Sequence, residues 1–172
     1  MRHEITRRLA ENEWFYVGDD QIVIRRYPAA DQPDFMVFEG LILPGGGPPT
    51  LHTHASSEFF YTLEGELTYF LQWSDGSLHA TNGPRATTAF IPPSAVHTYR
   101  NLSPSVGRVL AVVRPGSDLA AFFNEVAVWP TEERLAPAEV TRIYSAYGTI
   151  TQIDPSRIAP IDCVMTFDTG AL

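Results

Sequence analysis

Metal-ligating side chains are concentrated between residues 52 and 58 of the sequence. His52-Thr53-His54 places two imidazoles two residues apart, and Glu58 follows four residues later. Alternate residues of a β-strand share a face, whereas on a helix residues 52 and 54 would lie about 200° apart. A strand therefore lets both imidazoles reach one ion. Glu58 has the same parity, with room for a bend between, and His97 is predicted to join them from a distant strand.

Three neutral imidazoles and one carboxylate suit a divalent transition metal such as Fe, Ni, Mn, Co or Zn, and the ligand set does not decide among them. Calcium is disfavoured because it prefers oxygen ligands alone. Four protein ligands leave one or two coordination positions open, which is typical of a catalytic metal. Glu58 is predicted to be both a ligand and a catalytic base, because a carboxylate can swing away from the ion and accept a proton.

The elements that must carry these residues are short and mostly extended. Apolar and β-branched runs are bounded by Gly, Pro and Asn, which predicts an all-β sandwich or barrel. The predicted strands cover 21–27, 35–43, 58–63, 66–73, 90–91, 97–101 and 108–114. Two helices follow them. One spans about 118–126 with Ser117 as its N-cap, and the other runs from Pro137 to Gly148.

Composition limits the partners and the cellular location that we expect for the protein. The 172 residues include 12 basic and 20 acidic side chains, for a net charge of -8, which disfavours nucleic acid as a partner. No apolar run approaches the roughly 18 residues of a membrane span, so no membrane partner is expected. The charged start and a single cysteine, Cys163, predict a cytoplasmic protein. We expect one domain over 1–172, with a barrel core at about 21–114 and a helical appendage at about 117–172.

The spacing of these residues resembles the two motifs of the cupin superfamily. The first motif is matched at every interval by Gly46, His52, His54, Glu58 and Gly65. The second is matched by Pro92, His97 and Asn101, while Ala86 and Ser94 stand where two glycines are usual. The resemblance implies a cupin fold, that is, a double-stranded β-helix or jelly-roll barrel, here with short C-terminal helices. It also implies a homodimer.

Within that superfamily the chain looks most similar to the small single-domain quercetin dioxygenase-like group. The two motifs carry this resemblance together with the segment Phe122-Phe123-Asn124-Glu125 after Pro115-Gly116 and the helix end Ala146-Tyr147-Gly148. It implies a metal-dependent dioxygenase acting on a flavonol or a similar enolisable phenolic small molecule. Two alternatives stay open: a non-oxidative cyclase, isomerase or lyase at the same metal, and a small-molecule-binding cupin without catalysis.

Strand parity also indicates which side chains line a substrate pocket. Phe60 shares the face of Glu58, and Tyr99 and Asn101 share the face of His97. We therefore expect Phe60, Tyr99 and Asn101 to line the pocket, with plain core packing as the alternative for the two aromatic residues.

Overall fold

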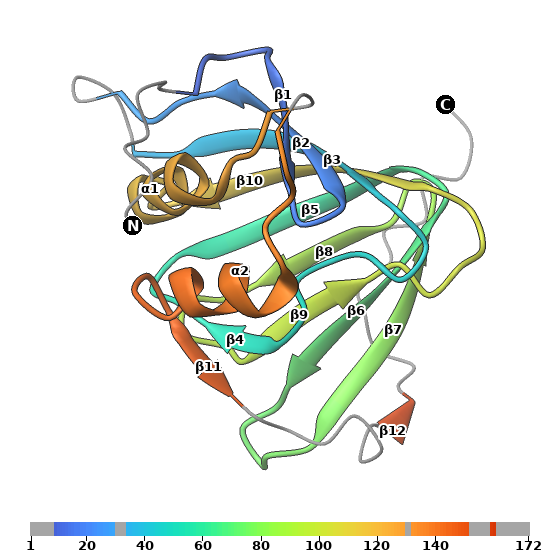
Figure 1. Cartoon of the computed structure of the whole chain (residues 1–172). Coiled ribbons are helices and arrows are strands. Elements are labelled where there is room, and N and C mark those ends of the chain that lie inside the picture. The colour runs from blue at the N-terminus through green and yellow to red at the C-terminus, as the bar shows by residue number, and fades with distance from the viewer. Residues whose placement is uncertain (1–8, 30–33, 130–131, 152–158, 161–172) are drawn as a thin grey trace.

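A computed structural model describes residues 9–29, 34–129, 132–151 and 159–160 (Figure 1). Cys163 and the end of the predicted appendage lie outside the described residues, and the extent of the single predicted domain stays a prediction. The strands are β1 (Trp14–Val17), β2 (Asp20–Arg26), β3 (Met36–Ile42), β4 (Leu51–Thr53), β5 (Ser57–Glu64), β6 (Glu66–Gln72), β7 (Leu78–Pro84), β8 (Thr88–Ile91), β9 (His97–Arg100), β10 (Gly107–Arg114), β11 (Thr149–Thr151) and β12 (Ala159–Pro160). The helices are α1 (Ser117–Val126) and α2 (Pro137–Tyr144).

The strands form two six-stranded sheets that face each other. One has the order β1-β2-β3-β10-β5-β8, and the other has the order β11-β4-β9-β6-β7-β12. Neighbouring strands are antiparallel except for β12, which pairs with β7 in parallel. The two helices lie at one open end, between the layers (Figure 1). The all-β jelly-roll barrel with short C-terminal helices is thus confirmed.

Alternation along the strands builds the core between the sheets. In β3 and β10 every second residue is buried, as expected for strands with one face toward a core. Val109, Ala111 and Val113 of β10 are fully buried, and Met36 and Phe38 of β3 join them. The alternate residues of both strands face outward, so each strand contributes one face to the barrel interior.

The chain changes sheets between His54 and Glu58. β4 pairs with β9 in one sheet, whereas β5 pairs with β10 and β8 in the other. The parity that His52 shares with Glu58 therefore does not carry through a single strand. Glu58 approaches the histidines because its strand lies in the facing sheet.

The helices differ from the prediction at their ends. α1 begins at Ser117 itself, and Gly116 is the N-cap without a side-chain capping bond, so the assignment of Ser117 as N-cap is wrong. The Ser117 hydroxyl instead donates to the Asp34 carboxylate at 2.8 Å. α2 ends at Tyr144 rather than at Gly148. Within the described residues, neither helix has the length and apolar character needed to cross a membrane.

Two turns before β9 adopt backbone conformations that favour glycine. Ala86 has φ +70° and Ser94 has φ +63°, both in the left-handed region. These are the positions where the resembling family usually has glycine. The tight turns therefore form with small side chains in place, although each residue stores about 1 kcal/mol or more of backbone strain.

A buried aspartate holds the glycine-rich loop that leads from β3 into β4. The Asp20 carboxylate accepts hydrogen bonds from the backbone N–H groups of Gly47, at 2.7 Å, and Leu43, at 3.0 Å. Gly47 has φ +101°, and a Cβ there would meet the backbone of Tyr99. The loop is thus fixed against both β2 and β9 immediately before it delivers His52.

Replacing Asp20 with Ala should destabilise the fold. The substitution leaves two backbone N–H groups without their acceptor, which predicts a loss of about 1–3 kcal/mol in the free energy of unfolding. Urea denaturation of Asp20→Ala would measure it, and Asp19→Ala, at the exposed neighbouring position, is the control. Equal midpoints for the two variants would contradict this role.

Candidate metal centre

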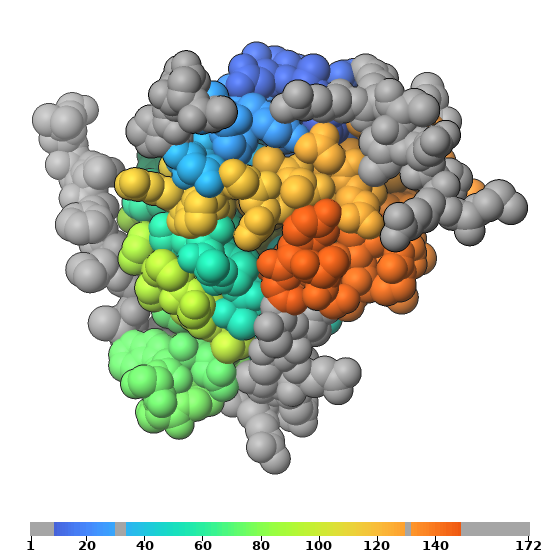
Figure 2. Space-filling model, turned by 90° about the vertical axis from the view of Figure 1, so that its left-hand side faces the viewer, coloured from blue at the N-terminus to red at the C-terminus, as the bar shows by residue number. Residues whose placement is uncertain are grey.

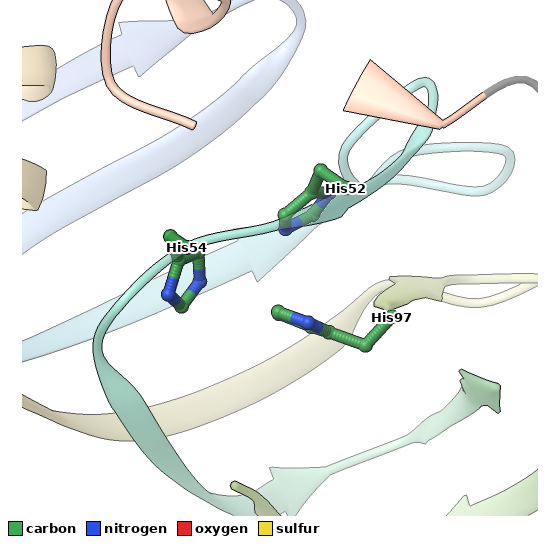
Figure 3. A group of neighbouring side chains, drawn as sticks. All are labelled: His52, His54 and His97. Carbon is green, nitrogen blue, oxygen red and sulfur yellow. The ribbon is translucent and has the colours of Figure 1, made fainter. Parts of the chain in front are cut away.

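Three histidines, from β4, the residue after it and the start of β9, lie close together (Figure 3). His52 lies in β4, His54 follows the end of that strand, and His97 is the first residue of β9. His52 and His97 are direct cross-strand partners. The ligand atoms of the three imidazoles all lie within 4.8 Å of one another. The pairing of β4 with β9 therefore assembles most of the predicted ligand set.

Backbone carbonyls fix the orientation of all three rings. Nδ1 of His52 lies 2.9 Å from the Thr50 oxygen, and Nδ1 of His97 lies 2.8 Å from the Ala95 oxygen. Nδ1 of His54 lies 3.1 Å from the Ser56 oxygen. A carbonyl can only accept, so each Nδ1 carries the proton. In a neutral ring Nε2 then keeps its lone pair, the arrangement by which proteins orient metal-binding imidazoles.

Glu58 completes the cluster from the facing sheet. Its side chain is buried, with Oε2 3.0 Å from Nε2 of His97 and Oε1 3.5 Å from Nε2 of His54. Burial alone would raise the pKa of this carboxyl. The hydrogen bonds and positive charge of His54 and His97 outweigh burial and hold the pKa of Glu58 well below its usual range. Glu58 is therefore a carboxylate at neutral pH.

The pKa values of the two histidines of the first motif are shifted in opposite directions. Burial, followed by the charge of His97, lowers the pKa of His52 to about 4, so this imidazole is neutral at physiological pH. Burial also opposes the charging of His54. However, its contact with the Glu58 carboxylate prevails and raises the pKa of His54 above the ordinary value. His54 is thus the imidazole that Glu58 favours in its protonated form.

The donor set fits a divalent transition metal. With Nδ1 protonated on each ring, the three Nε2 lone pairs and the Glu58 carboxylate are all acceptors facing one small space. Without a cation these groups repel one another, unless a ring takes up a second proton. One divalent ion removes that repulsion, and nitrogen with carboxylate oxygen is a ligand set that such ions prefer. The cluster can therefore hold a divalent metal. The individual ligand roles stay predictions.

A cavity of about 220 Å³ opens onto the cluster. His52, His54 and Glu58 line it, whereas His97 is 2% exposed and is absent from the described lining. The remaining wall near the histidines is mostly apolar and aromatic: Ile22, Phe38, Tyr99, Leu119, Phe122, Phe123, Val140 and Tyr144. A small molecule in this cavity would contact the histidine cluster directly.

Of the three predicted pocket residues, only one belongs to the described lining of the cavity. Tyr99 lines the cavity, as parity indicated. Phe60 and Asn101 are absent from the described lining. Phe60 packs deeper in the core with its ring 5.3 Å from that of Tyr99. Asn101 lies beyond the end of β9, where its side-chain amide donates to the backbone oxygens of Ile42 and Ser105. Asn101 therefore holds a turn together.

The sequence analysis assigned no pocket residue to the helices, which nevertheless supply part of the cavity wall. Tyr144, the last residue of α2, has its ring 4.8 Å from that of His52. Burial, with a smaller effect of the Glu58 charge, raises the pKa of Tyr144 far above its usual range. Helical spacing places Val140, Ile143, Tyr144 and Tyr147 on one apolar face of the predicted second helix. Nothing in that periodicity indicates that the face meets the histidines.

One protein-family model matches a stretch of the chain that contains both motifs. Residues 39–113 match the model of the cupin domain family. The matched residues contain His52, His54, Glu58 and His97, and they run from β3 into β10. The match, together with the jelly-roll topology, supports the cupin superfamily and shows a cupin fold. A search of curated proteins found no match.

Several solved structures are similar to this chain. The crystal structure of TT1209 from Thermus thermophilus is 25% identical, with 52% of this chain and 81% of that chain covered and a TM-score of 0.42. An RmlC-like cupin from Shewanella frigidimarina is 17% identical, with coverages of 64% and 92% and a TM-score of 0.49. A mutant of Bacillus subtilis oxalate decarboxylase is 19% identical, with coverages of 64% and 27% and a TM-score of 0.49.

Removing one imidazole should reduce metal binding. His52→Ala and His54→Ala each delete a proposed ligand, and we expect the metal affinity to fall about 10-fold or more, at least as much as for the loss of an outer-shell partner. Elemental analysis after loading with Zn²⁺ and desalting would measure occupancy. His79→Ala, which alters a histidine outside the cluster, is the control. Full occupancy in either cluster variant would refute that ligand.

Metal affinity should fall as the pH is lowered from about 8 to about 6. Because the pKa of His54 is raised above 6.5, protons compete with the metal for this ring at a higher pH than for an ordinary histidine. Competition with a chromophoric chelator across this range would measure the effect. Glu58→Gln removes the charge that raises the pKa of His54, so its pH profile should move to lower pH. Profiles with the same midpoint would contradict this coupling.

Proposed function

We propose that this cupin-fold chain is a metal-dependent enzyme, and specifically a dioxygenase that acts on a flavonol or a similar enolisable phenolic. The observation that carries the proposal is the cavity itself. Its wall joins the His52, His54 and Glu58 cluster to a mostly apolar, aromatic surface. A purely structural metal site would be closed, whereas this cluster opens toward a space that fits a small molecule.

Different residues of the cavity would have different roles in such a reaction. A divalent transition metal, when bound, supplies a Lewis-acidic centre for O₂ and for the phenolic oxygen. Glu58 is a carboxylate on the cavity wall, and it is the group that would accept the proton of the substrate hydroxyl. The bonds from Nδ1 to the backbone hold the three imidazoles in place while this happens. Phe38, Phe122 and the other apolar wall residues bind the flat rings and exclude water.

The redox balance of this reaction needs no further partner. In a dioxygenase reaction the substrate supplies the electrons that reduce O₂, and both oxygen atoms enter the products. An enolisable phenolic is electron-rich once its hydroxyl has lost a proton. Deprotonation by Glu58 therefore prepares the substrate for oxidation, and no external reductant is required. The homodimer and the cytoplasmic location implied earlier stay predictions.

Oxygen uptake with a flavonol panel would test the proposal. The protein would be loaded in turn with Fe²⁺, Mn²⁺, Co²⁺ and Ni²⁺, and we expect uptake that depends on the flavonol with at least one ion. Absence of substrate-dependent uptake with all four would refute the dioxygenase. Turnover that persists without O₂ would support a cyclase, isomerase or lyase instead, and a ligand that exchanges unchanged would support a binding protein.

Glu58→Gln should separate metal binding from turnover. The amide keeps the size of the side chain but cannot accept the proton, so turnover should fall about 100-fold or more while metal binding weakens modestly. Initial rates and metal content would be measured on the same preparation. Glu64→Gln makes the same change at the exposed end of β5 and should keep full activity. Unchanged turnover in Glu58→Gln would refute its role as a base.

A further inference from the structure

Helix α2 brings a phenol to the histidine cluster. On the face shown in Figure 2, α2 (orange-red) lies beside α1 (amber) and borders the teal segment around β4. Tyr144 is the last residue of α2, and its ring meets the ring of Phe122 in α1 edge-on, with 5.1 Å between centroids. The ring of Tyr144 also meets the ring of His52, with 4.8 Å between the two ring centroids. Two aromatic contacts therefore fix where this phenol lies.

The backbone after α2 is shaped to admit the Tyr144 ring. A Cβ on Gly148 would lie 3.0 Å from Cε1 and 3.1 Å from the hydroxyl oxygen of Tyr144, and 2.7 Å from the backbone oxygen of Thr53. A larger residue at position 148 would push against both. The phenol is thus enclosed by α1, the turn after α2 and His52, with the cavity as its remaining boundary.

The Tyr144 hydroxyl has no hydrogen-bond partner among the described residues, unlike the hydroxyls of Tyr69 and Tyr147. Tyr69 shares a hydrogen bond with Thr62 at 3.0 Å, and Tyr147 donates to Glu125 at 2.7 Å. Tyr144 is partly buried, and polar groups taken out of water in native proteins usually find a hydrogen-bond partner. For Tyr144, which lines the cavity, that partner can come from a bound molecule.

The chemistry of the cavity limits which molecule this is. The rings of His52 and Phe122 meet the ring of Tyr144. Arg100 is the only Arg or Lys in the described lining, which also holds the acidic residues Asp19, Asp20 and Glu58. Such a surface favours a flat, largely uncharged molecule over a phosphate or a dicarboxylate. The neutral phenol is a hydrogen-bond donor toward an oxygen atom placed beside the histidines.

We propose that the Tyr144 hydroxyl donates a hydrogen bond to an oxygen atom of the substrate, and that Tyr144 thereby selects flat aromatic molecules that carry oxygen next to the histidine cluster. This inference rests on the proposed function only in taking the cavity as the substrate site. It requires binding and positioning, with no oxidation step. Tyr144 is accordingly a specificity-determining residue contributed by the helical appendage.

Binding to the zinc-loaded protein tests this role without redox chemistry. The probes are 3-hydroxyflavone and 2-phenylnaphthalene, a flat molecule of similar outline without oxygen, and their affinities would be measured by fluorescence titration. Tyr144→Phe keeps the ring and removes only the hydroxyl. We expect this variant to bind 3-hydroxyflavone roughly 2- to 10-fold more weakly, as for the loss of one hydrogen bond, and to bind 2-phenylnaphthalene as the wild type does.

The control variant makes the same chemical change nearby. Tyr147→Phe deletes a hydroxyl that is bonded to Glu125 and that lies outside the described lining of the cavity, so its affinity for both probes should match the wild type. Zinc content measured on each variant checks that the cluster is intact. A merely structural role of Tyr144 would alter the affinities for both probes together.

The outcomes separate this inference from the dioxygenase proposal. Equal affinity of Tyr144→Phe and the wild type for 3-hydroxyflavone would overturn the inference, and so would a wild type that binds neither probe. A selective loss for 3-hydroxyflavone would support it, even if the wild type takes up no O₂ with any flavonol. In that case the dioxygenase proposal would fail while the role of Tyr144 stands.

Discussion

The structure depends on keeping one charged carboxylate inside the barrel. Burying an ion in a protein interior costs several kcal/mol unless partners compensate it, and Glu58 is 6% exposed. His54 and His97 provide that compensation, and His52 stays neutral beside them. The arrangement works only if the three rings cannot turn away, and the carbonyls of Thr50, Ala95 and Ser56 hold them. The pairing of β4 with β9 and the loop held by Asp20 place the histidines around Glu58.

Much of the histidine cluster can be predicted from the sequence because His52, His54 and Glu58 lie close together in the chain. The pair His52 and His54 predicts a strand, and the match at His97 predicts closure by a second strand. The extension of parity to Glu58 did not hold, because the chain crosses between sheets there. The strand β7 was not predicted, since its His, Asn, Gly and Pro residues have weak β-propensity and it forms by pairing with β6.

The remainder depends on contacts between distant segments. Periodicity identifies an apolar face on α2 but gives no information about what the face covers. Parity predicts the side of a strand and not the depth of a side chain, so Tyr99 reaches the cavity whereas Phe60 stays in the core. Asn101 has the right parity, yet its polar side chain is used by backbone groups of the turn after β9. Each difference comes from packing that only the folded chain defines.

The cavity wall is divided between two parts of the chain. The family match, residues 39–113, contains every proposed ligand, while α1 and α2 follow it and supply Leu119, Phe122, Val140 and Tyr144. Apart from Tyr144, whose ring meets that of His52, substitutions in the helices can therefore remodel the cavity away from the imidazoles. The histidine cluster and the helical part of the wall are open to separate change in evolution, and a designer could exchange other helix residues while leaving the cluster intact.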